Sequence, residues 1–142
     1  MSDDHYGSCV WTPGSNYAAK TPHGAIEMFG DDGQRAVEVM LLSAAACLNY
    51  FLVEYAQARR LPVERLEVRC DGDIAKRPER VSHIRTHVAI QGMLSDSDAQ
   101  RMVSICELAC KVMNTLRIPP ECSIEIKNQA TAKGTVQPDS VG

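Results

Sequence analysis

The stretch that decides the fold reads Val37-Glu38-Val39-Met40-Leu41-Leu42-Ser43-Ala44-Ala45-Ala46-Cys47-Leu48-Asn49-Tyr50-Phe51-Leu52. Its apolar residues recur three and four positions apart, which predicts one long helix over about residues 34–60. The middle of this segment is small or apolar on every side, as is typical of a helix buried in a core. Because the apolar run is shorter than the ~20 residues of a membrane span, we expect a core helix and no membrane association.

Short apolar segments bounded by turn residues predict strands on both sides of this helix. We expect three short strands before it, then a hairpin, a second helix and a last strand, at residues 9–11, 17–20, 25–29, 65–74, 84–90, 95–117 and 122–127 respectively. Because the strands come in hairpins, the order favours an α+β fold with antiparallel sheets over a doubly wound parallel sheet. We find no internal repeat or linker, so residues 1–142 are expected to form a single domain.

The hairpin shows the clearest alternation in the chain. Leu66, Val68, Cys70 and Ile74 share one face of its first strand, and charged residues occupy the other face. In its second strand the charged and polar face carries His83, Arg85 and His87. One face of the hairpin is therefore predicted to be buried and the other to face water.

Composition limits the class of function. The chain has a net charge of −3 and 23% charged residues, spread without a basic patch, which argues against a nucleic-acid partner. The first residues are acidic and polar where a secretory signal would be basic and then apolar, so we expect a cytoplasmic protein. One small sheet could not cover so apolar a main helix, and a partner subunit is the natural way to bury the remainder.

Six cysteines stand out in a chain expected to occupy a reducing compartment. There, buried thiols, metal ligands or catalytic groups are more common than structural disulfides. Cys70 and Cys122 fall at inward strand positions, and Cys9 lies in a terminal strand, so all three are interpreted as structural. Cys106 and Cys110 are four apart and share a helical face.

The spacing of cysteines and histidines does not predict a metal site. A zinc site would need two further ligands near Cys106 and Cys110. The sequence has no Cys-x-x-Cys motif, and its His-x-x-x-His pair, His83 and His87, falls on the strand face predicted to meet solvent. The four histidines are scattered and are interpreted as surface residues: His5, His23, His83 and His87. We expect no metal and no bound cofactor.

Cys47 lies in the middle of the main helix within a collar of alanines, where packing alone would favour a larger side chain. Leu41-Leu42-Ser43-Ala44-Ala45-Ala46-Cys47, followed by Cys110-Lys111-Val112-Met113-Asn114-Thr115-Leu116, resembles the OsmC/Ohr family of osmotically inducible and organic-hydroperoxide-resistance proteins. The first segment is similar to the family's leucine-rich run ending in Ala-Ala-Cys. The second is similar to its Cys-Pro-x-Ser-Asn-x-Leu segment, and the order of elements between them agrees.

This resemblance implies an intertwined homodimer with long central helices and active sites at the subunit interface. It also implies a thiol peroxidase of the antioxidant stress response, with Cys47 as the peroxidatic cysteine and Cys110 as the resolving one. Such an enzyme reduces organic hydroperoxides and is regenerated by an external dithiol. The first cysteine must be a thiolate, although burial among apolar residues raises the pKa of a thiol, so a cation must offset the burial.

The chain departs from the family pattern where that cation is expected. In the peroxidase branches, an arginine from the N-terminal strands is held by a glutamate ten residues before the first cysteine, where this chain has Val37. Glu38 falls one position later, which is about 100° around a helix. No arginine precedes Arg35, so Lys20 and Arg35 are the substitute candidates for binding substrate. Lys111 and Met113 also replace the family's proline and serine, which places the chain nearer a divergent branch of the family.

Three functions stay open on the sequence. The leading one is thiol-dependent reduction of organic hydroperoxides through Cys47 and Cys110, with Glu38 assisting. The second is a dimeric binding protein that keeps an apolar pocket for a small ligand without peroxidase turnover, which the missing arginine favours. The third is a thiol-based redox or metal sensor using Cys106 with Cys110.

Overall fold

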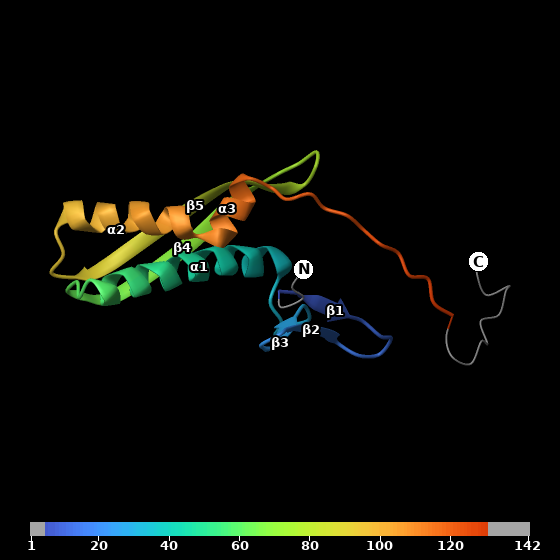
Figure 1. Ribbon diagram of the computed structural model, residues 1–142. Coiled ribbons are helices and arrows are strands. Elements are labelled where there is room, and N and C mark those ends of the chain that lie inside the picture. The colour runs from blue at the N-terminus through green and yellow to red at the C-terminus, as the bar shows by residue number, and fades with distance from the viewer. Residues whose placement is uncertain (1–4, 131–142) are drawn as a thin grey trace.

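The computed structural model describes residues 5–130 (Figure 1). Its N-terminal part is a three-stranded antiparallel sheet in the order β1-β2-β3, which lies beside the N-terminal end of the longest helix. These strands are β1 Ser8–Val10, β2 Tyr17–Thr21 and β3 Gly24–Met28. The prediction of three short strands at these positions is confirmed, with small shifts of the boundaries.

The long helix α1 spans Ala36–Ala58. It begins directly after Arg35, whose backbone is extended, and ends at Arg59, whose guanidinium lies 3.8 Å from the centre of the Tyr55 ring. Its alanine-rich face is buried, with Ala44 at 0% and Ala45 at 7% exposure. The predicted core helix is therefore confirmed, and two residues at each end of the predicted range fall outside it.

The hairpin consists of β4 Val63–Ala75 and β5 Arg80–Gly92, paired antiparallel. Leu66 faces Ile90 and Val68 faces Val88 across the strands, and this apolar face packs on α1. The prediction fails at Ile74, which is 61% exposed. A register shift between Asp73 and Ile74 interrupts the alternation there, so Ile74 does not continue the buried face.

The outer face of the hairpin carries a charged network centred on Arg85. Its guanidinium donates to Asp71 Oδ1 at 2.7 Å and to Asp73 Oδ2 at 2.8 Å, and His87 Nε2 lies 3.0 Å from Asp71 Oδ2. Burial raises the pKa of Asp71, but hydrogen bonds from Arg85 and His87 outweigh that effect and hold the pKa below 3.8. The Arg85 hydrogen bond likewise lowers the pKa of Asp73. The prediction of a solvent-facing polar face is confirmed.

The second helical region is broken, which the sequence did not predict. Helix α2 spans Asp96–Ala109 and α3 spans Lys111–Arg117, and Cys110 between them has an extended backbone with φ −71° and ψ 102°. The start of α2 agrees with prediction, because the hydroxyl of Ser95 accepts a hydrogen bond from the Asp98 amide. At the break, Asn114 Nδ2 donates to the Leu108 carbonyl at 3.0 Å and so replaces a helical backbone hydrogen bond.

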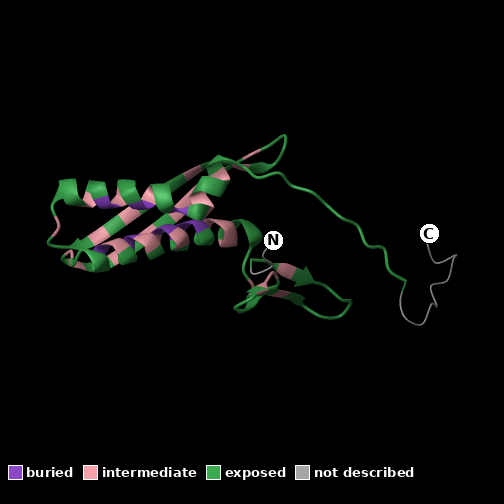
Figure 2. Cartoon of the chain, in the orientation of Figure 1, coloured by how far each residue is buried: buried purple, intermediate pink, exposed green. Residues whose placement is uncertain are grey.

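The core of the chain lies where α1, α2 and the hairpin meet. The buried faces of α1 and α2 turn toward one another and toward the hairpin (Figure 2). The fully buried side chains there are Leu52, Met102 and Cys110. Together these layers confirm an α+β fold with antiparallel sheets.

Residues 118–130 form no strand, and they extend away from the body of the molecule (Figure 1). The predicted strand at residues 122–127 and the inward position of Cys122 are therefore wrong for the isolated chain. Ile124 is 92% exposed, Ile126 is 85% exposed, and Cys122 is also exposed, with its thiol 3.7 Å from the Pro120 carbonyl. The physical reason is that an extended segment becomes a strand only when a neighbouring strand satisfies its backbone groups.

Candidate functional site

Two cysteines from different helices lie together in the core. The side chain of Cys47, from the middle of α1, is within hydrogen-bonding reach of the Cys110 thiol. Cys110 is 1% exposed, whereas Cys47 is half-buried. The long apolar helix fixes the first sulfur, and the break between α2 and α3 turns the second toward it. Both are free thiols in this structure.

The environment of Cys110 favours the protonated thiol. Burial raises its pKa, the backbone N–H of Met113 lowers it, and the side-chain hydrogen bond and then the charge of Cys47 raise it again. The net pKa of Cys110 lies above 9.0. Cys110 is therefore a protonated thiol at neutral pH.

A cavity of about 270 Å³ opens beside Cys110. Apolar side chains from α1, β5, α2 and α3 form most of its wall: Leu48, Ile84, Val88, Val103 and Met113. The cavity is also lined by Glu107 and Arg117, which form an ion pair between α2 and α3. Sequence reasoning missed this pair, because no motif joins two oppositely charged residues ten positions apart.

The residues predicted to assist Cys47 do not line this cavity. Lys20 lies on β2 beside a groove of about 820 Å³ on the N-terminal sheet. Glu38 lines a different groove, of about 390 Å³, together with Arg69 and Cys70. Arg35 is exposed at the start of α1. The acid and base that line the cavity beside Cys110 are Glu107 and Arg117.

Cys106 is buried close to this site and is held separately from it. Its thiol donates to the Phe51 carbonyl at 3.4 Å. Burial raises the pKa of Cys106, and the charge of Arg59 partly opposes that effect. Residues 5–130 contain no cluster of three or more cysteine, histidine or acidic side chains arranged to hold a metal ion.

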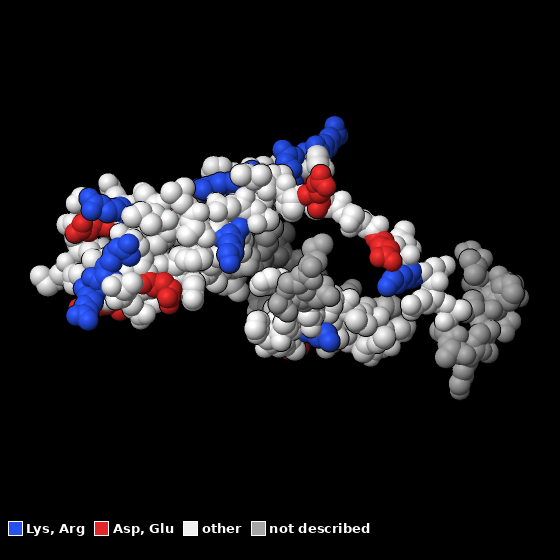
Figure 3. Space-filling model, viewed as in Figure 1, with Lys and Arg blue, Asp and Glu red and all other residues white. Residues whose placement is uncertain are grey.

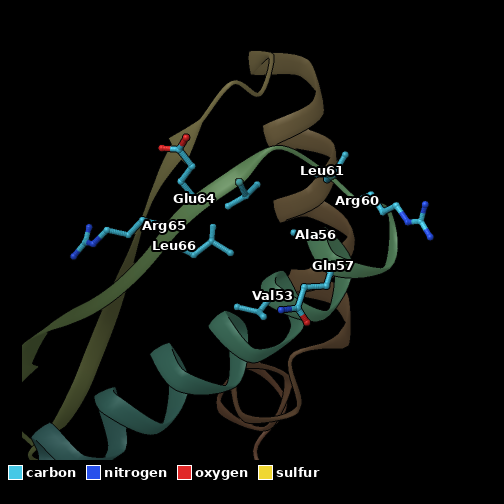
Figure 4. Close-up of a pocket in the computed structure, with 9 residues that line it drawn as sticks. Val53, Ala56, Gln57, Arg60, Leu61, Glu64, Arg65 and Leu66 are labelled. Atoms are coloured by element: carbon cyan, nitrogen blue, oxygen red, sulfur yellow. The ribbon is translucent and has the colours of Figure 1, made fainter.

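A second cavity, of about 290 Å³, lies at the C-terminal end of α1 (Figure 4). Val53, Ala56 and Leu66 contribute to its apolar lining, whereas Arg60 and Arg65 project outward in different directions. No cysteine or histidine lines it. The cavity beside Cys110 is therefore the better candidate for chemistry.

Charge is unevenly distributed on the surface. On the face shown in Figure 3, charged side chains gather mainly at the two ends of the helix-and-hairpin body, and few lie between them. Helix α1 also exposes large apolar side chains, among which Leu42 and Tyr50 are each 61% exposed.

Comparison with known proteins places this fold in a family. The family model for OsmC-like protein matches residues 29–125, and no curated protein matches the chain. A hypothetical protein from Aquifex aeolicus VF5 superposes with a TM-score of 0.71 at 16% identity, covering 83% of this chain and 90% of that one. An OsmC-like protein from Mycoplasma pneumoniae gives a TM-score of 0.71 at 18% identity, with 82% and 89% covered.

A third solved structure has a descriptive name. It is an organic hydroperoxide resistance protein from Elizabethkingia anophelis, with a TM-score of 0.62 at 16% identity, covering 82% of this chain and 91% of that one. At such identities the structural likeness establishes the fold alone. Because the family model covers more than half of the sequence, however, the chain belongs to the OsmC-like protein family.

Proposed function

We propose that this protein reduces organic hydroperoxides through Cys47 and Cys110. The observation that carries the proposal is the meeting of these two thiols from separate helices, one half-buried and the other protonated and buried. A solved relative in fold is named an organic hydroperoxide resistance protein, which supports the same chemistry. The small and apolar residues around Cys47 on α1, among them Ala44 and Leu48, favour hydrophobic peroxides over hydrogen peroxide.

The proposed reaction has three steps: cleavage of the peroxide, formation of a disulfide and its reduction by a dithiol. The Cys47 thiolate attacks the terminal peroxide oxygen, the O–O bond breaks, and the alkoxide takes a proton and leaves as an alcohol. The sulfenic acid left on Cys47 then condenses with the Cys110 thiol, forming a disulfide and releasing water. An external dithiol reduces this disulfide by two successive exchanges and is itself oxidised.

The state of the second sulfur supports this division of roles. A resolving cysteine needs to stay a thiol until the sulfenic acid forms beside it. The raised pKa of Cys110 keeps it protonated at neutral pH, and its position next to Cys47 provides the short reach that condensation requires.

The proposal includes a homodimer, in which a second copy of the chain covers the exposed apolar surface. Helix α1 is long and apolar enough to cross a membrane, yet only 22% of its apolar window is buried within one chain. A membrane location fits poorly, because α1 packs against a two-stranded hairpin whose open edges could not be satisfied in hydrocarbon. A second copy could cover both Leu42 and Tyr50 on α1 and the exposed isoleucines of residues 118–130.

The experiment that tests the function counts thiols. Fully reduced protein is mixed with one equivalent of cumene hydroperoxide, and the remaining thiols and disulfide-linked peptides are identified by mass spectrometry. We expect rapid loss of two thiols with a Cys47–Cys110 link, which Cys47→Ser abolishes. Cys9→Ser is the matched control, because Cys9 is exposed on β1 and remote from the site.

A contrary result has a clear meaning. If the thiols of the native protein survive for hours, the peroxidase proposal is wrong and a binding function for a small apolar ligand replaces it. That second function is favoured by one observation: Lys20, Arg35 and Glu38 do not line the cavity beside Cys110.

A further inference from the structure

We propose that the cavity beside Cys110 is the entry path of the reductant, and that Arg117, held by Glu107, positions the incoming thiolate to attack the Cys110 sulfur of the oxidised pair. This inference rests on the proposed function and extends it to the regeneration step. It assigns a role to two residues for which the sequence suggested none.

The first argument is access. Cys110 lines the cavity of about 270 Å³, and Cys47 does not. A molecule that enters the cavity therefore meets the Cys110 sulfur first. The apolar side chains of the wall give room for the carbon skeleton of a small thiol.

The second argument is charge. The thiolate is the attacking species in disulfide exchange, so the path to the disulfide has to accept an anion. Arg117 lines the same cavity, and its side chain is 53% exposed, while the Glu107 carboxylate binds Nη2. A guanidinium carries five N–H donors, so the ion pair fixes its position and leaves other donors for an entering anion.

The third argument concerns the bond that breaks. The reductant thiolate forms a bond to Cys110 Sγ, the Cys47–Cys110 bond breaks, and Cys47 leaves as a thiolate. The second thiol of the reductant then attacks the mixed disulfide, which returns Cys110 as a thiol and releases the oxidised dithiol. The sulfur that carries negative charge more readily is the better leaving group. Burial raises the pKa of Cys110, so attack at Cys47, which would expel Cys110 as the leaving thiolate, is disfavoured.

The test separates regeneration from peroxide chemistry. The disulfide is formed with diamide, without any peroxide, and its reduction by dithiothreitol is followed in the native protein, Arg117→Met, Arg117→Lys, Glu107→Gln and the control Arg101→Met. Arg101 is exposed on α2, as Arg117 is on α3, but it does not line the cavity. We expect about a tenfold slower reduction in Arg117→Met and partial recovery in Arg117→Lys, since a lysine keeps the charge but not the fork of donors.

Two further readouts distinguish positioning from structure. Added salt should slow reduction of the native disulfide more than that of Arg117→Met, because only the native protein has the attracting charge. When glutathione replaces dithiothreitol, the mixed disulfide can be trapped by quenching with acid, because a monothiol has no second thiol to resolve it. Peptide mass spectrometry should then find glutathione on Cys110. The rate at which cumene hydroperoxide oxidises the thiols should fall less in Arg117→Met than the rate of reduction does.

Three results would overturn the inference. They are glutathione on Cys47, native-like reduction of Arg117→Met, and an equal effect of Arg101→Met. If diamide forms the Cys47–Cys110 disulfide but cumene hydroperoxide does not, the peroxidase proposal is wrong. The position of glutathione, on Cys110 or on Cys47, then still decides the proposal for the entry path. If diamide forms no Cys47–Cys110 link, both proposals are wrong.

Discussion

Replacing Leu52 with alanine should test the packing that supports the cysteine pair. Leu52 is 0% exposed and belongs to the same buried cluster as Met102, Cys106 and Cys110. Because α1, α2 and the hairpin enclose it, the site has little freedom to collapse into the space left behind. We therefore expect a loss of about 3 kcal/mol in the free energy of unfolding, within the range for buried leucines.

The measurement is urea unfolding followed by far-ultraviolet circular dichroism. With an m-value of about 2 kcal/mol per molar urea, the loss corresponds to a midpoint lowered by roughly 1.5 M. The matched control is Leu108→Ala, because Leu108 lies on the same pair of packed helices but is 78% exposed. Its unfolding free energy should change by no more than about 0.5 kcal/mol.

Protein concentration has to be equal in all samples, since self-association would add to the apparent stability. Equal midpoints for the two variants would refute the assignment of Leu52 to the centre of the core. A large loss in Leu108→Ala would instead show that this surface of α2 is covered in solution.

Three other predictions follow from particular contacts. Asn114→Ala should lower the free energy of unfolding by about 1 kcal/mol in urea titrations, because the Leu108 carbonyl loses its side-chain donor. Asp73→Asn should be less stable than the native protein at pH 6, because Arg85 lowers the folded-state pKa of Asp73 and so stabilises the folded carboxylate. The difference in unfolding free energy should shrink as the pH falls below 3.8, since protonation of that carboxylate removes the stabilisation. Urea titrations in which the difference stays constant from pH 6 down to the lowest pH at which both proteins fold would contradict this. Iodoacetamide at pH 8 should modify Cys106 far more slowly than the exposed cysteines, because its burial raises the pKa; peptide mass spectrometry measures the order.

The elements with the strongest periodicity could be predicted from the sequence. Helix α1 and the hairpin alternate so regularly that their buried faces follow from residue type alone. The buried alanines of α1 and the facing pairs of β4 and β5 lie where that pattern puts them. The deviation at Ile74 could not be predicted, because a register shift leaves no signal in hydrophobicity.

The break at Cys110 is harder to see in the sequence. No glycine or proline marks it, and the apolar spacing continues through it. It is stabilised by the contact of Asn114 with the Leu108 carbonyl, which depends on side-chain geometry. The ion pair of Glu107 and Arg117 depends on this break. On an unbroken helix, residues ten positions apart lie about 15 Å apart along the axis, so a continuous helix would not predict the pair.

The cysteines of the candidate site could be predicted from the sequence, but its charged residues could not. The choice of Cys47 and Cys110 came from the family resemblance, and the structure brings their side chains together. The choice of Lys20, Arg35 and Glu38 came from seeking the family's missing groups nearby in sequence. Spatial proximity of charged groups depends on tertiary structure, so the pair that shares the cavity with Cys110 could not be found that way.

The helix break also changes how one departure from the family motif is interpreted. Because Cys110 precedes α3, Lys111 is the first residue of a helix, where the backbone N–H has no partner within the helix. Proline is well tolerated at that position, since its ring fixes a helical φ and its missing N–H costs nothing there. Lysine and the family's proline are thus exchangeable at residue 111 as far as the backbone is concerned. The departure from the family motif at Lys111 therefore leaves intact the turn of chain that presents the second sulfur.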